Sequence, residues 1–171
     1  MAESIRPHSQ FLPYLLNRVV SQINSPMQRH LRKRGMTLTH WRVLGFLRER
    51  DGLIISELAD HTVTDQATLS RALDRLEERG WIERVVALSD SRQFEVHLTA
   101  AGRDQYEALA EHGQAVEAWA LRNLSAQETN QLRETLDRIS DSMRISSPSL
   151  SPSLSPSLSS SLSSSPSAAL E

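Results

Sequence analysis

The side chains best suited to chemistry lie on one predicted helix, over residues 65–79. Its apolar residues recur at i, i+3, i+4 and i+7, so that a polar face lies opposite them. That face carries short hydrogen-bonding side chains and arginines: Gln66, Thr68, Ser70, Arg71 and Arg75. Gln pairs with adenine and Arg with guanine in bidentate geometries when such a helix enters a major groove. The alternative is a solvated face whose charges form the pairs Asp74–Arg71 and Glu78–Arg75.

A second group of polar residues belongs to a predicted β-hairpin. Residues 81–88 are rich in Ile and Val, residues 93–98 alternate strictly between apolar and polar, and 89–92 form a polar turn. At the tip, Arg92 is placed to contact a minor groove or its phosphates, while Asp90 can hold Arg84 or Arg92 in a fixed pose. In isolation, Asp-x-Arg would be a surface ion pair worth less than ~1 kcal/mol. After a helix-turn-helix, it predicts a DNA-contacting wing.

The elements that position these groups follow from periodicity and caps. Helices are expected at 9–34, 37–50, 55–60, 65–79, 99–123 and 126–143, with the hairpin at 81–98. Pro26 lies inside the first of them and predicts a kink or break near Ser25. The order is that of a mainly α, winged helix-turn-helix protein. The apolar stripes of the last two helices have no other partner in so small a fold, which predicts a homodimer.

The motifs that carry this order are L38-T-H-W-R-V-L44, S56-E-L-A59, L69-S-R71, L76-E-E-R-G80, D90-S-R92 and L98-T-A-A-G102. Together they resemble the MarR family of bacterial winged-helix regulators, over residues 9–143. The resemblance implies a homodimer in which the first helix and the last two interlock. It also implies a recognition helix at 65–79, a minor-groove arginine at Arg92 and an orienting role for Asp90. Two residues depart from the family pattern. Pro26 lies inside the first helix, and Ile54 stands where a polar residue often caps the helix that follows.

The same resemblance implies release from DNA by a small aromatic carboxylate or phenol. Arg18, in Y14-L-L-N-R18, is the expected anchor for the carboxylate, and His40 and Trp41 begin the facing helix. The alternative gives Arg18 a structural ion pair, His40 a capping role and Trp41 a place in the core.

Composition excludes several classes of function. The chain has 171 residues, a net charge of −2 and no cysteine, which rules out disulfides and thiolate chemistry. No spacing indicates a metal site, a cofactor site or a catalytic centre, so we expect no enzyme. The absence of long apolar runs and of a signal segment predicts a soluble, cytoplasmic protein. Residues 146–171 hold fourteen Ser, four Pro and five Leu, and we expect a disordered, dispensable tail.

The sequence therefore predicts a ligand-responsive repressor that binds a pseudo-palindromic operator in double-stranded DNA as a homodimer. Its expected parts are a dimerisation helix at 1–36, a DNA-binding lobe at 37–98, dimerisation helices at 99–145 and the tail at 146–171. The alternative is a winged-helix adaptor that binds other proteins and reads no DNA sequence, which the nearly balanced charge favours.

Overall fold

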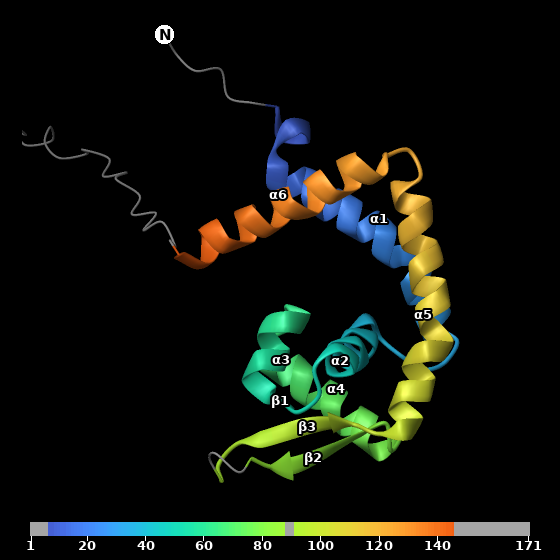
Figure 1. Ribbon diagram of the computed structural model, residues 1–171, viewed down its shortest axis with the longest axis vertical. Helices are drawn as coiled ribbons and strands as arrows, with labels where there is room; N and C mark the ends of the chain where they lie inside the picture. Colours follow the sequence, from blue (N-terminus) through green and yellow to red (C-terminus); the bar gives the residue numbers. More distant parts are fainter. Residues whose placement is uncertain (1–6, 88–90, 146–171) are drawn as a thin grey trace, which may run out of the picture. The chain divides into compact units, whose positions relative to one another are not determined.

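The computed structural model describes residues 7–87 and 91–145 (Figure 1). A single 3-10 turn, His8–Gln10, precedes helix α1 (Leu12–Arg32). The following elements are α2 (Leu38–Glu49), β1 (Leu53–Ile54), α3 (Ile55–Thr62), α4 (Gln66–Glu78), β2 (Ile82–Val86), β3 (Phe94–Leu98), α5 (Ala100–Leu121) and α6 (Ala126–Ile145). This is the predicted winged helix-turn-helix order. The tail at 146–171 and Asp90 lie outside the described residues.

Side-chain caps fix where the helices begin. At the start of α2, the Thr37 hydroxyl accepts from the His40 N–H at 3.2 Å, and His40 Nδ1 accepts from the Thr37 N–H at 3.3 Å. Asp65 caps α4 by accepting from the Thr68 N–H, and Thr99 caps α5 by accepting from the Gly102 N–H. Ile54 offers no side-chain cap to α3, as expected, but its own N–H donates to Glu57 at 3.1 Å.

The sheet has three antiparallel strands in the order β1-β3-β2. The predicted hairpin is present, with Arg84 opposite Val96 and Val86 opposite Phe94. Strand β1 was not predicted, because two residues are too few for a periodic signal. Leu53 pairs with Val96, so β1 ties the end of α2 to the wing.

The core lies where α2, α3 and α4 meet the sheet. Its fully buried side chains include Leu44, Leu47, Leu58, Leu73, Leu76, Ile82 and Val96. Helix α5 adds Leu109, which is also fully buried. The expectation that the α5 stripe lacks a partner within the chain is therefore wrong for its first half. Tyr106 packs against this core, and Gly113 lies against Trp41 of α2.

The wing joins α5 through a close contact. The Thr99 hydroxyl donates to the Gly80 carbonyl at 2.7 Å and accepts from the Gly102 N–H at 3.0 Å. A Cβ at Gly102 would lie 1.9 Å from the carbonyl oxygen of Trp81. Glycine is required here by space, because the helix start touches the backbone before β2.

Helix α1 corrects a second expectation. It runs without interruption from Leu12 to Arg32 with Pro26 inside it, so of the predicted kink or break near Ser25 the break is wrong. Proline removes one backbone donor, and packing of the neighbouring turns holds the helix together. Met27, which follows Pro26, and Leu31, one turn farther along, are the residues of α1 that are buried.

By its internal contacts, the chain divides into two units at Ser125 and Ala126. The first contains α1 to α5 with the sheet, and the second contains α6. Among the described residues, no helix is both long and apolar enough to cross a membrane.

Candidate DNA-binding surface and effector pocket

Helix α4 buries one face and exposes the other, as its periodicity predicts. Leu69, Ala72, Leu73 and Leu76 face the core. Among the candidate DNA-contacting residues, Gln66, Ser70, Arg71 and Arg75 are exposed, and Thr68 is half-buried. The structure thus places all five on the outer side or at the start of one helix.

The first turn of α4 is held by its own side chains. Asp65 Oδ1 accepts from the Thr68 N–H at 2.9 Å, and this hydrogen bond lowers the pKa of the Asp65 carboxyl. Arg71 Nη2 donates to the Thr68 hydroxyl at 3.3 Å. Thr68 therefore supports the helix start, and Arg71 points back toward it. An exposed guanidinium at this end of the helix suits a guanine edge or a phosphate.

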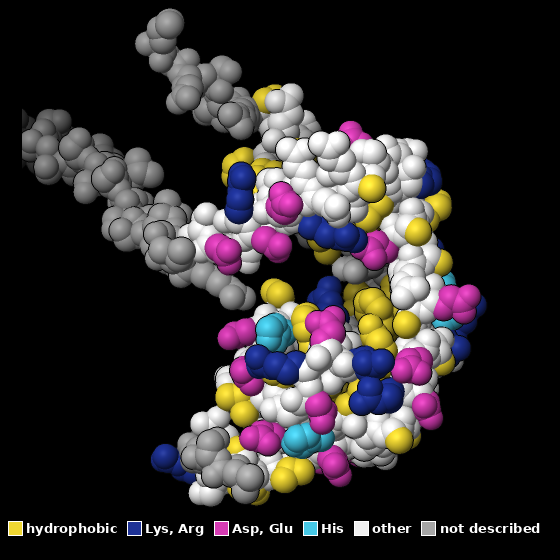
Figure 2. Space-filling view, in the orientation of Figure 1, with side chains coloured by type: hydrophobic (Ala, Val, Ile, Leu, Met, Phe, Trp, Pro, Cys, Tyr) yellow, Lys and Arg dark blue, Asp and Glu magenta, His cyan; other side chains and the backbone are white. Residues whose placement is uncertain are grey.

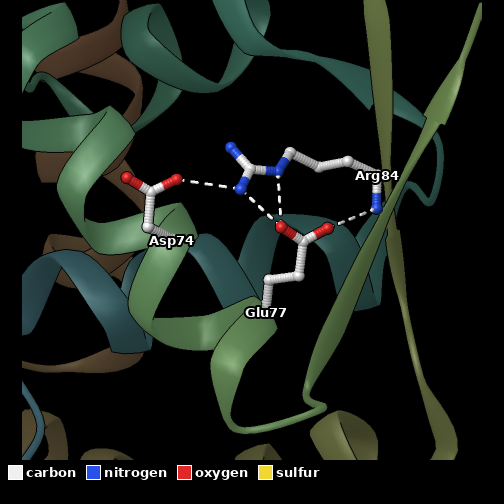
Figure 3. A network of polar contacts seen from close by, with 3 residues as sticks. All are labelled: Asp74, Glu77 and Arg84. Carbon is white, nitrogen blue, oxygen red and sulfur yellow. Dashed lines mark hydrogen bonds and ion pairs between the residues drawn. The ribbon is translucent and has the colours of Figure 1, made fainter.

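Arg84 joins the wing to α4 (Figure 3). From strand β2, its guanidinium donates to Asp74 Oδ1 at 2.8 Å and, through Nε, to Glu77 Oε2 at 2.9 Å. Its backbone N–H donates to the other oxygen of Glu77 at 3.2 Å. The hydrogen bonds from Arg84 lower the pKa of Glu77, and those to Glu77 and Asp74 raise the pKa of Arg84.

This network revises the ion pairs considered from the sequence. Asp74 pairs with Arg84 and not with Arg71. Arg84 of β2 contacts Asp74 and Glu77 of α4, whereas the predicted partner, Asp90, lies outside the described residues. Two carboxylates three residues apart on a helix lie on one face, which is the signal that could have identified Asp74 and Glu77 as its partners.

The far end of α4 is attached to the turn after α1. Arg79 donates to the carbonyl of Arg34 at 3.2 Å and to that of Gly35 at 3.0 Å. Its guanidinium also lies 4.8 Å from the ring centroid of Trp81. No sequence pattern indicates this contact, because it joins residues 44 and 45 positions apart.

The wing tip carries Arg92, which is exposed in the turn before β3. On the face shown in Figure 2, basic and acidic side chains alternate over the winged-helix part of the chain. Any attraction for DNA on that face therefore depends on individual arginines and not on a continuous basic surface.

A small pocket lies between α2 and α5. Its volume is about 160 Å³, and it is lined by Trp41, Arg42, Gly45, Phe46, Glu49 and Tyr106. An apolar cavity of ~150 Å³ holds one benzene ring, so this pocket matches a single aromatic ring. The Trp41 and Tyr106 rings stack with centroids 6.4 Å apart. Trp41 Nε1 is buried and has no hydrogen-bond partner among the described residues.

The three residues expected at an effector site are not brought together. Trp41 lines the pocket. His40 is 2% exposed and caps α2; burial, followed by the nearby Arg79 and Arg75 charges, lowers its pKa to about 4. Arg18 is exposed on α1, with its guanidinium 5.7 Å from the ring centroid of Tyr14. The pocket's cation is Arg42, which sequence reasoning missed although it follows Trp41 directly.

Comparisons with known proteins agree with this architecture. A sequence model of the MarR family matches residues 34–93. The HTH-type transcriptional repressor Rv2887 of Mycobacterium tuberculosis is 30% identical over 132 residues, covering 75% of this chain and 92% of the relative. A MarR-family regulator from Silicibacter pomeroyi has a TM-score of 0.74 and 33% identity, over 81% of this chain and 93% of the other. A mutant MarR from E. coli in complex with operator DNA has a TM-score of 0.67 and 26% identity, over 79% and 99% of the two chains.

Proposed function

The chain belongs to the MarR family of transcriptional regulators, and we propose that it acts as a homodimeric repressor that a small aromatic acid releases from its operator. The relatives found are regulators of transcription and not enzymes. The observation that carries the proposal is helix α4, which exposes Gln66, Ser70 and Arg71 while Arg84 ties it to the wing.

We assign base reading to the first half of α4. Gln66, Ser70 and Arg71 lie at the helix end that enters the major groove in helix-turn-helix proteins. Thr68 contributes by fixing the Arg71 side chain, and Arg75 is placed for a phosphate farther along. Arg92 contacts the minor groove or its phosphates, and Arg84 with Asp90 orients the wing.

A homodimer accounts for apolar surface that the chain leaves uncovered. On α1, Leu12, Leu16, Val19 and Val20 are exposed at spacings that place them on one face. On α6, the same holds for Leu132, Leu136, Ile139 and Met143. A twofold dimer presents two copies of α4, which matches a pseudo-palindromic operator.

The pocket between α2 and α5 is the proposed effector site. Aromatic walls from Trp41, Phe46 and Tyr106 suit a single ring. The ligand changes DNA affinity only if it binds the DNA-incompetent arrangement of the dimer more tightly. A coupling of 1–3 kcal/mol would weaken DNA binding about 5- to 150-fold.

Two alanine variants test the assignment of DNA contacts. The minor groove presents a degenerate pattern, so Arg92→Ala should weaken binding to operator and random duplexes alike. It should also reduce the slope of log K against log salt concentration by about one unit. Arg71→Ala should cost roughly 1–3 kcal/mol on the operator and much less on random DNA. Gel shifts with duplexes selected from a random pool, at several salt concentrations, measure both effects.

The same gel shifts separate a repressor from the adaptor. An adaptor would show no shift that depends on DNA sequence, and neither variant would change its binding. Equal losses for both variants on both kinds of duplex would contradict the division of roles between the recognition helix and the wing.

A further inference from the structure

The pocket between α2 and α5 contains two charged side chains, Arg42 and Glu49. Arg42 is half-buried, and within the described part of the chain no carboxylate forms an ion pair with it. Glu49 is exposed, two helical turns farther along α2. A ligand that suits both side chains carries one carboxylate, which Arg42 attracts. It carries no second negative charge, which Glu49 would repel.

We propose that Arg42 binds the carboxylate of a small aromatic monoacid and transmits the effect of ligand binding from the pocket to the recognition helix. This inference rests on the proposed function, because it assigns the anchor and the relay for the same effector site. It makes Arg42, and not Arg18, the residue on which the response to the acid depends.

The relay is a contact that Arg42 already makes. Its Nη1 donates to the carbonyl oxygen of Thr62, the last residue of α3, at 3.3 Å. The same oxygen accepts from the Thr64 hydroxyl at 3.1 Å. Thr62 lies three residues before Asp65, which caps α4, so one guanidinium connects the pocket to the turn that leads into the recognition helix.

The turn that receives this contact is strained. Val63 follows Thr62 with φ of 51° and is 87% exposed. The left-handed region is unfavourable for a β-branched residue, at a cost of about 1–3 kcal/mol. Its surroundings hold the turn in place, and Arg42 supplies one of the contacts. A carboxylate that draws the guanidinium toward the pocket weakens that contact.

A second pocket side chain reaches the same turn of α3. The Phe46 ring stacks on His61, with centroids 5.0 Å apart. An aromatic ring in the pocket contacts Phe46. Phe46 in turn stacks on His61, the residue before Thr62. Two of the six pocket residues therefore contact the last turn of α3.

Arg18 neither lines the pocket nor contacts the end of α3. It lies over Tyr14 of its own helix. The comparison of Arg42 with Arg18 can therefore be made in one experiment, with the same chemical change at each position.

The test titrates sodium benzoate against the full chain bound to a labelled, selected duplex, with fluorescence anisotropy as the readout. Wild type, Arg42→Gln, Arg18→Gln and Arg48→Gln are compared. Arg48 is the matched control, since it lies on α2 outside the pocket and pairs with Glu107. A charge-assisted contact implies that Arg42→Gln needs roughly ten- to hundredfold more benzoate for release. Benzamide, which has the same ring and no charge, should not release the wild type.

Two further measurements on the DNA-free proteins keep the proposal testable if Arg42→Gln binds DNA poorly. Calorimetry should show the same loss of benzoate affinity for Arg42→Gln, with Arg18→Gln close to wild type. Amide exchange should accelerate at Val63 and Thr64 when benzoate binds wild type, because their N–H groups donate to Asp60 and Ala59 within this turn. In Arg42→Gln the same concentration should leave these amides unchanged.

The outcomes separate the inference from the function on which it rests. If benzoate releases wild type and Arg42→Gln equally, or if only Arg18→Gln loses the response, the role of Arg42 is refuted and the aromatic-acid effector stands. If benzoate binds but exchange at Val63 and Thr64 does not change, the relay is refuted. If benzoate neither binds nor releases the wild type, the effector proposal and this inference both fail.

Discussion

His40 shows how one buried side chain can make the stability of this protein depend on pH. It is neutral in the fold because burial and the charges of Arg79 and Arg75 lower its pKa from 6.5 to about 4. His40 binds a proton more readily in the unfolded chain than in the folded one. The contribution of neutral His40 to the free energy of unfolding is therefore complete above pH 6.5, and it is lost as the pH falls toward 4.

His40→Gln tests this dependence while keeping the cap. A Gln at this position can still accept from the Thr37 N–H, as in a capping box. Between pH 7 and 4, wild type should lose up to about 3 kcal/mol more stability than the variant. Urea unfolding across this pH range measures the difference. His97, whose pKa is raised by its hydrogen bond to Asp51, titrates in both proteins and cancels in the comparison. Parallel stability curves would show that His40 does not titrate as described.

At the scale of elements, Arg84 connects the wing and the recognition helix. Arg84→Met keeps the aliphatic stem and removes the pairs with Asp74 and Glu77. Since these carboxylates are 50% and 38% exposed, the loss of stability should be only about 1 kcal/mol. Operator affinity should fall as well, because α4 and the wing lose their common orientation.

Arg103→Met, an exposed arginine on α5, is the matched control and should change neither quantity. Arg84→Lys should restore part of the affinity through one remaining pair. Urea unfolding and fluorescence anisotropy provide the two measurements. Reduced stability with unchanged operator affinity would show that this network supports the fold but does not orient the DNA-binding elements.

The order of the elements could be predicted from the sequence because helices of three turns or more carry a strong periodic signal. Strand β1, with two residues, carries none. The continuity of α1 through Pro26 could not be predicted either, since tertiary packing overrides the local preference. The polar face of α4 followed from periodicity, whereas the partners of Arg84 and the position of Arg42 depend on contacts between distant segments.

At the scale of the whole molecule, the main prediction concerns assembly. The exposed stripe of α1 continues along the same helix face as the buried Met27 and Leu31. Burial of this stripe and that of α6 between two copies should form an obligate interface of more than about 2,000 Å². The protein should therefore sediment as a dimer at micromolar concentration.

Val20→Glu tests the α1 stripe directly. Val20 is 50% exposed, and a charge buried at a dimer interface without a partner strongly disfavours association. The variant should shift the dimer toward monomer in sedimentation velocity and lose operator affinity. Gln22→Glu, on an exposed position of the same helix, carries the same charge and should remain dimeric. A wild-type monomer at micromolar concentration would overturn the assembly.

The contact at Gly102 determines which residue this protein tolerates at that position. Any side chain there would collide with the Trp81 carbonyl, whereas Ala100 and Ala101 are exposed and free to vary. The glycine in L98-T-A-A-G102 is thus a marker of the junction between wing and helix. It constrains neither the operator sequence nor the chemistry of the effector. A chain with a different operator and a different effector could therefore keep this glycine. For that reason the motif identifies the architecture and is independent of the regulated genes.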